Sequence, residues 1–300
     1  MSSLVWLASY PKSGNTWFRL LAANLSAAEG PVDINDVPDR GGIASSRGEF
    51  EAMTLIESGL LTHEEADALR PRVYEALARA EPAEDGAGPR LVKAHDAYVT
   101  TPAGEPLLGG ARAAILIVRD PRDVAPSLAN HRRCSVDEAI DFMNSPKASF
   151  ASTRRAQPQQ LRQRLLDWSC HAASWLDQTD IPVRLVRYED LTAAPVETLR
   201  GAMAFAGLAV SSGQAEQAVA YAAFDHLRSQ EEARGFAEWR DKGDGRRFFR
   251  RGESGGWRRE LTCEQVGRIE AAHRPMMQRL GYRMQDEESS VPQMTEGVFR

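Results

Sequence analysis

The sequence is poor in cysteine and lacks long apolar runs. Its three cysteines, Cys134, Cys170 and Cys263, include no Cys-x-x-Cys pair, so neither a disulfide framework nor a zinc ribbon is expected. The early apolar run Leu4–Ala8 is far too short to cross a membrane. A formal net charge of −5 gives no support to a general nucleic-acid-binding surface. These absences predict a soluble protein of a reducing compartment, the cytoplasm, with no membrane and no nucleic-acid partner.

Lysine is also scarce, although cations are not. Of the 37 lysines and arginines, only four are lysines: Lys12, Lys93, Lys147 and Lys242. Codon bias could produce this imbalance, but it still makes each lysine worth inspecting for a specific task. The composition, 42% hydrophobic and 26% charged over 300 residues, is that of a globular protein able to bury a large core.

Buried strands and helices alternate along the chain. The runs Leu4–Tyr10 and Ala113–Val118 are typical of buried strands, and Asp120 can cap a helix that starts at Pro121 and continues to about Arg133. The other predicted elements are a helix over Thr16–Leu25, a helix over about Thr62–Ala80, a strand over Arg90–His95, a helix opened by Ser135 and Glu138, a helix with Leu161, Leu165, Trp168, Ala172 and Trp175 on one face, and a strand over Val183–Tyr188. We therefore predict an α/β fold: a single domain over residues 1–284 with a central, mainly parallel sheet flanked by helices, and a disordered tail over residues 285–300.

The first candidate site is the P-loop-like strand-loop-helix at the N-terminus, Ser9–Trp17. A glycine at Gly14 lets backbone N–H groups approach a ligand, and the following helix N-terminus favours an anion. Lys12, Ser13 and Thr16 would complete a phosphate cradle. The loop lacks the Gly-Lys-Ser/Thr ending of a Walker A motif, so the Mg²⁺ chemistry of an NTPase does not transfer to it. An ordinary strand-to-helix turn is an equally good explanation of this loop alone.

A second candidate site follows the Ala113–Val118 strand. Arg119 emerges at its carboxyl end, where ligands bind in open α/β sheets, and Ser127 lies two helical turns further on. The alternative is that Arg119 pairs with Asp120 or Asp123 as a surface ion pair.

The third candidate site is a cationic segment over residues 240–259, which combines eight cations with three carboxylates and so carries a local charge of +5. Its glycines give it flexibility, and a flexible cationic loop can clamp a polyanion. A solvated charged loop is the competing explanation. The cations are Arg240, Lys242, Arg246, Arg247, Arg250, Arg251, Arg258 and Arg259, and the carboxylates are Asp241, Asp244 and Glu253.

His95 and Lys93 project from one face of the predicted strand toward its carboxyl end. A neutral imidazole there could remove a proton from a hydroxyl, although a lone histidine is more often structural. The other histidines show no metal-ligand spacing with each other or with cysteine, so no metal site is expected.

Together these motifs resemble those of the sulfotransferases that use 3′-phosphoadenosine 5′-phosphosulfate (PAPS). They occur in family order from residue 5 to about residue 280, and the opening residues together with Asn15 look closer to the bacterial, antibiotic-modifying branch than to the animal one. The animal dimer motif is not retained around Cys263 and Gly267, which leaves the oligomeric state open. The matching segments are Pro11-Lys-Ser-Gly-Asn-Thr-Trp17, Lys93-Ala-His95, Val118-Arg-Asp-Pro-Arg-Asp-Val-Ala-Pro-Ser127, Tyr188-Glu-Asp-Leu191 and Arg250-Arg-Gly-Glu-Ser-Gly-Gly-Trp-Arg258.

The resemblance implies in-line transfer of a sulfuryl group from PAPS to a hydroxyl of a small-molecule or natural-product acceptor. His95 would be the base, Lys93 would steady the sulfuryl group, and Lys12 would stabilise the leaving group. Ser127 would bind the 3′-phosphate and restrain Lys12. The remaining implied donor contacts are Ser13, Gly14, Asn15 and Thr16 to the 5′-phosphate, Trp17, Tyr188 and Phe224 to adenine, and Arg119, Arg250, Arg251 and Gly252 to the 3′-phosphate.

Two other hypotheses are a P-loop kinase of a small molecule and a non-catalytic nucleotide-binding protein that kept the fold. The missing Gly-Lys-Ser/Thr ending counts against the kinase. The presence of His95 together with Lys12 counts against pure binding, because binding alone needs no positioned base.

Overall fold

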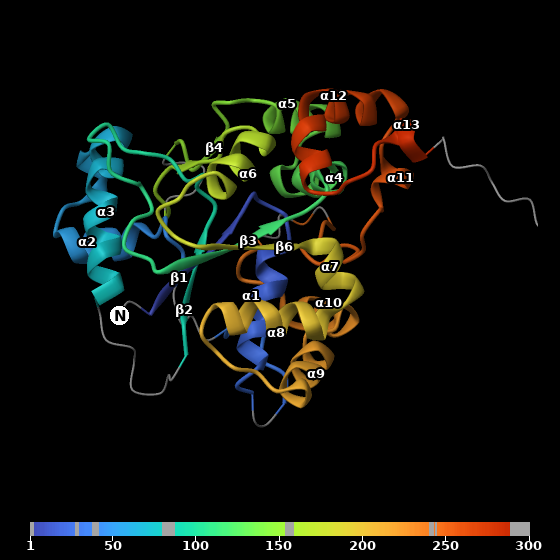
Figure 1. Ribbon diagram of the computed structural model, residues 1–300, viewed down its shortest axis with the longest axis horizontal. Helices are drawn as coiled ribbons and strands as arrows, with labels where there is room; N and C mark the ends of the chain where they lie inside the picture. The colour runs from blue at the N-terminus through green and yellow to red at the C-terminus, as the bar shows by residue number, and fades with distance from the viewer. Residues whose placement is uncertain are drawn as a thin grey trace, which may run out of the picture.

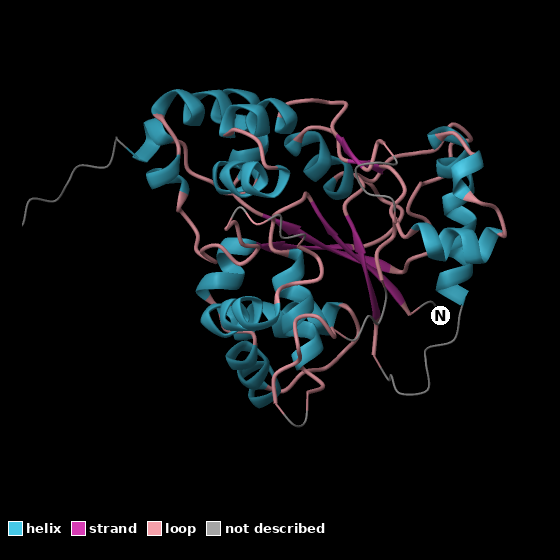
Figure 2. Ribbon diagram, turned by 180° about the vertical axis from the view of Figure 1, so that it is seen from behind, coloured by secondary structure: helices cyan, strands magenta, loops and turns pink. Residues whose placement is uncertain are grey.

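The computed structural model describes residues 3–27, 30–37, 42–79, 88–153, 159–239, 243 and 245–288. Helices pack on both sides of a central sheet, and two more helices, near the amino terminus of the chain, lie beyond one edge of it (Figures 1 and 2). The elements in chain order are β1 (Leu4–Ser9), α1 (Asn15–Asn24), α2 (Arg47–Thr54), the 3₁₀ turn η1 (Ser58–Leu60), α3 (His63–Arg79), β2 (Arg90–Ala94), β3 (Ala113–Val118), α4 (Pro121–Arg132), α5 (Val136–Met143), β4 (Ser149–Phe150), β5 (Gln163–Arg164), α6 (Trp168–Leu176), β6 (Val183–Arg187), α7 (Tyr188–Ala193), α8 (Pro195–Phe205), α9 (Ser212–Tyr221), α10 (Phe224–Arg234), α11 (Trp257–Glu260), α12 (Cys263–Arg279) and α13 (Gln285–Glu288).

The central sheet has the strand order β2-β1-β3-β6, and each neighbouring pair is parallel. Leu7 of β1 lies opposite Lys93 of β2 and Ile115 of β3, so the carboxyl ends of the strands meet at one edge. The predicted α/β fold with a parallel sheet is therefore confirmed. The same register brings the residues that follow β1, β2, β3 and β6 to that edge.

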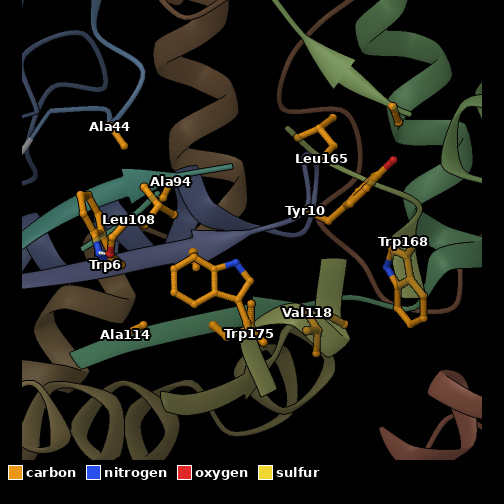
Figure 3. Close-up of a cluster of buried hydrophobic side chains, with 14 of the residues drawn as sticks. Trp6, Tyr10, Ala44, Ala94, Leu108, Ala114, Val118, Leu165, Trp168 and Trp175 are labelled. Atoms are coloured by element: carbon orange, nitrogen blue, oxygen red, sulfur yellow. Dashed lines mark hydrogen bonds between the residues drawn. The ribbon is translucent and has the colours of Figure 1, made fainter. Parts of the chain in front are cut away.

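Alternate residues of β1 and β3 point into two separate cores, which explains why both strands are buried along their whole length. Trp6 and Ala8 face the first core, under α4, α5, α6 and α12, while Val5 and Leu7 face the second, over α1, α8 and α9 (Figure 1). Figure 3 shows the first core, where the Trp6 indole N–H donates to the Leu108 carbonyl at 2.9 Å. The sheet is thus held rigidly from both sides.

Helix starts are predicted well where a cap residue marks them. The Asp120 side chain accepts the N–H of Arg122 at the start of α4, and Ser135 and Glu138 form the expected capping box of α5. The predicted disordered tail includes the four residues of α13, which are helical, and the rest of that tail lies outside the described residues.

The prediction of a helix through Leu161 and Leu165 is wrong. The helix α6 begins only at Trp168, where Asp167 caps it, and residues 161–165 are extended and include β5. Leu161, Gln163 and Leu165 are buried while the residues between them are less so, which is the period of a strand. Leu161 and Leu165 do belong to the first core together with Trp168. Their burial was therefore predicted correctly, and their helical backbone conformation was not.

A buried arginine, Arg70, ties α3 to Asp96, the second residue after β2. The Arg70 side chain is fully buried, and its guanidinium donates to Asp96 Oδ2 at 2.6 Å, to Asp67 Oδ1 at 3.2 Å and to the Tyr74 hydroxyl at 2.7 Å. Asp96 also accepts the N–H of Arg164 at 2.8 Å. Because Asp96 directly follows His95, this network fixes the chain at the carboxyl edge of the sheet.

Removing Arg70 should destabilise the fold strongly. We expect Arg70→Met to lower the free energy of unfolding by roughly 3–5 kcal/mol, because it leaves two buried carboxylates without their shared cation. Arg72→Met is the matched control: its side chain is 64% exposed in pairs with Glu75 and Glu105, so about 1 kcal/mol or less is expected. Urea denaturation of both variants measures the difference, and equal losses would contradict this account of the network.

Candidate functional site

A cavity of about 620 Å³ opens at the carboxyl edge of the sheet. Its walls come from the loop after β1, the ends of β2 and β3, the starts of α1, α7 and α10, the end of α4, and the segment around residues 248–252. Every predicted site residue except Ser13 lines it. These are Lys12, Gly14, Asn15, Thr16, Trp17, Lys93, His95, Arg119, Ser127, Tyr188, Phe224, Arg250, Arg251 and Gly252.

The loop between β1 and α1 is shaped to expose backbone N–H groups. Gly14 has φ of 102°, and a Cβ there would lie 2.5 Å from Tyr188 Cδ2, so only glycine fits. No side chain in the described part of the chain caps the first turn of α1. The amino-terminal N–H groups of this helix therefore border the cavity without a protein acceptor, which is the usual setting of an anion site.

Two loop side chains lie deeper than the sequence analysis implied. Asn15 donates through Nδ2 to the Leu7 carbonyl at 2.9 Å and to Ser9 Oγ at 3.1 Å, so its amide ties α1 to β1. Ser13 is fully buried, and its hydroxyl oxygen has no hydrogen-bond partner among the described residues. A direct contact of either side chain with a phosphate stays a prediction.

Lys12 combines a strained backbone with an ammonium group that burial desolvates. Its φ of 70° is left-handed, which is uncommon for a residue with a side chain. Its ammonium nitrogen lies 3.8 Å from the centre of the Phe248 ring. Burial, followed by the nearby charges of Lys93 and Arg119, lowers the pKa of Lys12 from 10.5 to about 7. The lysine therefore titrates near neutral pH and favours an incoming anion.

His95 places a neutral, hydrogen-bonded imidazole in the cavity wall. Its Nδ1 lies 2.8 Å from the Ser9 carbonyl oxygen, and because a carbonyl can only accept, Nδ1 carries the proton and Nε2 has the free electron pair. Burial, and then the charge of Lys93, lowers the pKa of His95 well below 6.5, so the ring is neutral. His171 donates through Nε2 to the His95 carbonyl at 3.1 Å and so holds its backbone in place.

Arg119 is not held by the neighbouring carboxylates that were its alternative partners. Asp120 pairs with Arg122 at 2.7 Å, and Asp123 accepts the N–H groups of Gly255 and Trp257. The Arg119 guanidinium donates to the carbonyls of Lys12 at 3.4 Å and Glu253 at 2.9 Å, and it lies 4.3 Å from the Tyr188 ring centre. Its Nε is buried with no hydrogen-bond partner among the described residues.

The cationic segment contributes only part of its charge to the cavity. Arg250 and Arg251 both pair with Glu260, and both line the wall. Gly252, with φ of 69°, allows close contact with Phe224, since a Cβ would lie 2.1 Å from the ring. Arg258 and Arg259 lie outside the lining, and Arg240, Asp241, Lys242 and Asp244 are outside the described residues.

Aromatic rings form one wall beside the loop. Trp17 and Tyr188 meet edge to face with ring centres 5.7 Å apart, and the Trp17 indole donates to the Ala222 carbonyl at 3.0 Å. Phe224 begins α10 on the same wall. These rings offer flat apolar surface next to cations, which suits a nucleobase.

The sequence analysis missed several residues of the cavity, among them Arg19, His131 and Glu238. Arg19 lies one helical turn after Thr16, a spacing that could have revealed it. The His131 ring lies between Phe150 and Trp239, 6.0 Å from each. Glu238 sits in an irregular segment, where no periodicity marks it.

Two further observations concern metals and membranes. Within the described ranges, no group of three or more His, Cys, Asp or Glu side chains could hold a metal ion. No helix in the same ranges is long and apolar enough to cross a bilayer.

Comparison with known proteins identifies the family. The chain is 24% identical over 238 residues to luciferin sulfotransferase of Photinus pyralis, a match that spans 74% of this chain and 56% of that protein. Retinol dehydratase in complex with androsterone and PAP superposes with a TM-score of 0.60 at 19% identity, covering 95% of this chain and 83% of that one. Mouse sulfotransferase SULT7A1 complexed with PAP gives 0.57 at 20% identity, covering 91% and 83%. Because residues 2–281 match the sulfotransferase domain, the chain belongs to the sulfotransferase family.

Proposed function

We propose that this protein is a PAPS-dependent sulfotransferase that transfers a sulfuryl group to a hydroxyl of a small-molecule or natural-product acceptor. One observation carries the proposal: a single cavity unites a neutral histidine, a lysine of lowered pKa and the uncapped amino terminus of α1. The acceptor class agrees with structural relatives whose complexes contain androsterone or retinol. We place the enzyme in the cytoplasm because its three cysteines are unpaired.

The residues present fit a doubly phosphorylated nucleotide. Arg119, which lines the cavity, has a buried Nε without a protein partner among the described residues, which is costly unless a ligand or water serves it. The close approach of Gly14 to Tyr188 leaves no room for a side chain at that turn. The cations of the wall come from two separate segments of the chain, Lys12 from the loop after β1 and Arg250 with Arg251 from the segment around residues 248–252.

We assign the donor contacts accordingly. The N–H groups of Gly14 to Trp17, with the Thr16 hydroxyl, would hold the 5′-phosphate. Arg119, Ser127, Arg250 and Arg251 would hold the 3′-phosphate, and the Trp17, Tyr188 and Phe224 rings would border adenine. PAPS supplies the sulfuryl group as a substrate. Lys12 would then stabilise the negative charge that develops on the leaving phosphate oxygen.

His95 would perform the proton transfer. The acceptor oxygen forms the new O–S bond while its proton passes to His95 Nε2, and the S–O bond to the 5′-phosphate breaks with its electron pair left on the phosphate. Lys93 lies in β2, two residues before His95, and its ammonium group would neutralise the sulfuryl oxygens. A positioned base of this kind contributes about 10²–10⁴ in rate.

Two other hypotheses fit the cavity less well. A P-loop kinase has no use for the second cationic group, Arg250 with Arg251, in the cavity wall. A non-catalytic nucleotide binder has no use for the His95 imidazole in this state, in which Nδ1 donates to the Ser9 carbonyl and Nε2 is left unprotonated. Residues 1–284 as one domain, followed by a tail, remain our proposal for the organisation of the chain.

The 3′-phosphate should decide nucleotide affinity. Two or three charge-assisted hydrogen bonds are worth about 3–6 kcal/mol, so PAP should bind roughly 10²–10⁴-fold more tightly than AMP in calorimetry. Arg251→Met should shrink that ratio. Arg259→Met, a 63% exposed arginine outside the cavity lining, should not. Tighter binding of ATP–Mg²⁺ than of PAP would favour the kinase instead.

Loss of the imidazole should stop chemistry and spare binding. We expect His95→Ala to bind PAP as the wild type does and to lose about 10²–10⁴ in turnover. Turnover is measured with labelled PAPS against a panel of phenols, alcohols and glycopeptides, with the exposed His226→Ala as control. Normal turnover in His95→Ala refutes the role of the base. A wild type that binds PAP but sulfates no panel member supports the non-catalytic hypothesis.

Donor affinity should weaken as the pH rises above neutrality. With a pKa of about 7 in the free protein, Lys12 is largely neutral at pH 8–9, so binding the anionic PAP requires proton uptake. The Kd of PAP should therefore rise by up to about tenfold per pH unit between pH 7 and 9. His95 and His131 do not contribute, since burial lowers the pKa of both imidazoles below this range. Lys12→Met should bind weakly with a flat profile, and a flat profile in the wild type would contradict the lowered pKa.

A further inference from the structure

Among the described residues, one carboxylate lines the cavity, that of Glu238, and the proposed reaction does not use it. Glu238 Oε2 accepts from Lys93 Nζ at 3.2 Å and from the Thr16 hydroxyl at 3.5 Å. Its other oxygen, Oε1, accepts from Arg19 Nη1 at 2.5 Å. The three donors come from β2 and from two positions on α1, and Glu238 reaches them from a segment more than 200 residues away from α1.

This carboxylate is charged throughout the physiological pH range. Burial alone would raise its pKa, but the cations Lys93 and Arg19 outweigh that effect and lower the pKa of Glu238 to about 2. Its side chain is 34% exposed, while those of Arg19 and Lys93 are 16% and 14% exposed. The two cations are thus sequestered by the carboxylate.

We propose that Glu238 is an internal competitor of the donor: its carboxylate occupies the place of the transferring anion between Thr16 and Lys93, and PAPS must displace it. The inference rests on the proposed function, which gives Thr16 to the 5′-phosphate and Lys93 to the sulfuryl group. The Lys93 ammonium and the Thr16 hydroxyl that hold the carboxylate are also those that the phosphosulfate needs. A negative carboxylate beside a negative phosphosulfate is repelled, so both cannot occupy this end of the cavity.

The Glu238 carboxylate would also promote release of the product after the reaction. The same carboxylate can return to Lys93 and Thr16 once the sulfuryl group has left, and this return weakens the hold on the product PAP. Glu238 would therefore limit PAP affinity mainly by speeding its dissociation. The adjacent Trp239 lines the same cavity, with its ring centre 6.0 Å from that of His131.

The test compares Glu238→Gln with Glu75→Gln. Glutamine keeps the shape of the side chain and removes its charge. Glu75 is a matched control because its side chain is also 34% exposed and also paired with two cations, Arg72 and Arg79, but lies outside the cavity lining. We expect Glu238→Gln to bind PAP about tenfold more tightly than the wild type, with slower dissociation in stopped-flow measurements, and Glu75→Gln to match the wild type.

Unchanged or weaker PAP binding by Glu238→Gln overturns the inference, and weaker binding would mean that Glu238 positions Lys93 for the donor. Inorganic sulfate is the second probe, because it tests the anion site without the nucleotide. If the wild type fails to prefer PAP over AMP, the proposed function is wrong. Tighter sulfate binding by Glu238→Gln than by the wild type still supports competition in that case, and equal sulfate binding overturns it.

Discussion

The parallel register of β1 with β2 and β3 is the constraint on which the site depends. These strands are buried in two cores, and their carboxyl ends place Lys12, His95 and Arg119 within a few residues of the same edge. Lys12 has a left-handed backbone conformation in this position. Such a conformation costs about 1–3 kcal/mol of free energy and persists only where the surrounding structure enforces it. The buried sheet supplies that enforcement, so the strained lysine is a consequence of the rigid core.

The second constraint is electrostatic. Lys12, Lys93 and Arg119 share one cavity, and their mutual repulsion adds to burial in lowering the pKa of Lys12. The chain offsets part of this charge itself: Glu260 lies between Arg250 and Arg251, and Glu238 lies between Arg19 and Lys93. Cations prepared for a ligand must have some counter-charge in the free protein. In the proposed donor complex, the phosphates and the sulfuryl group would compete with these internal carboxylates, so the affinity for the donor would be the difference between the two sets of interactions.

Sequence patterns predicted the parts of the structure whose cause is local. The strand Ala113–Val118 and the cap at Asp120 were found because apolar runs and cap residues act over a few positions. The prediction of a helix through Leu161 was wrong because the backbone conformation of that segment is set by hydrogen bonds to residues far away in the sequence. One example is Ala148, whose carbonyl accepts the N–H of Leu165. Glu238 was missed for the same reason. Its role comes from contacts with Arg19 and Lys93 that no spacing reveals, whereas the family motifs marked residues already tied to strand ends.

The environment of His95 explains how a weak base can serve this chemistry. The one carboxylate beside it in sequence, Asp96, is committed to Arg70, and His95 instead donates to a main-chain carbonyl. A carbonyl fixes the tautomer without adding the negative charge that would raise the pKa of the ring. Lys93 lowers that pKa further, so in the free protein His95 gains a proton only at a cost. A bound anion that offsets Lys93 would remove part of this cost. In the proposed reaction, proton transfer from the acceptor to His95 would then be more favourable when the donor is in place, and the two substrates would be coupled through charge.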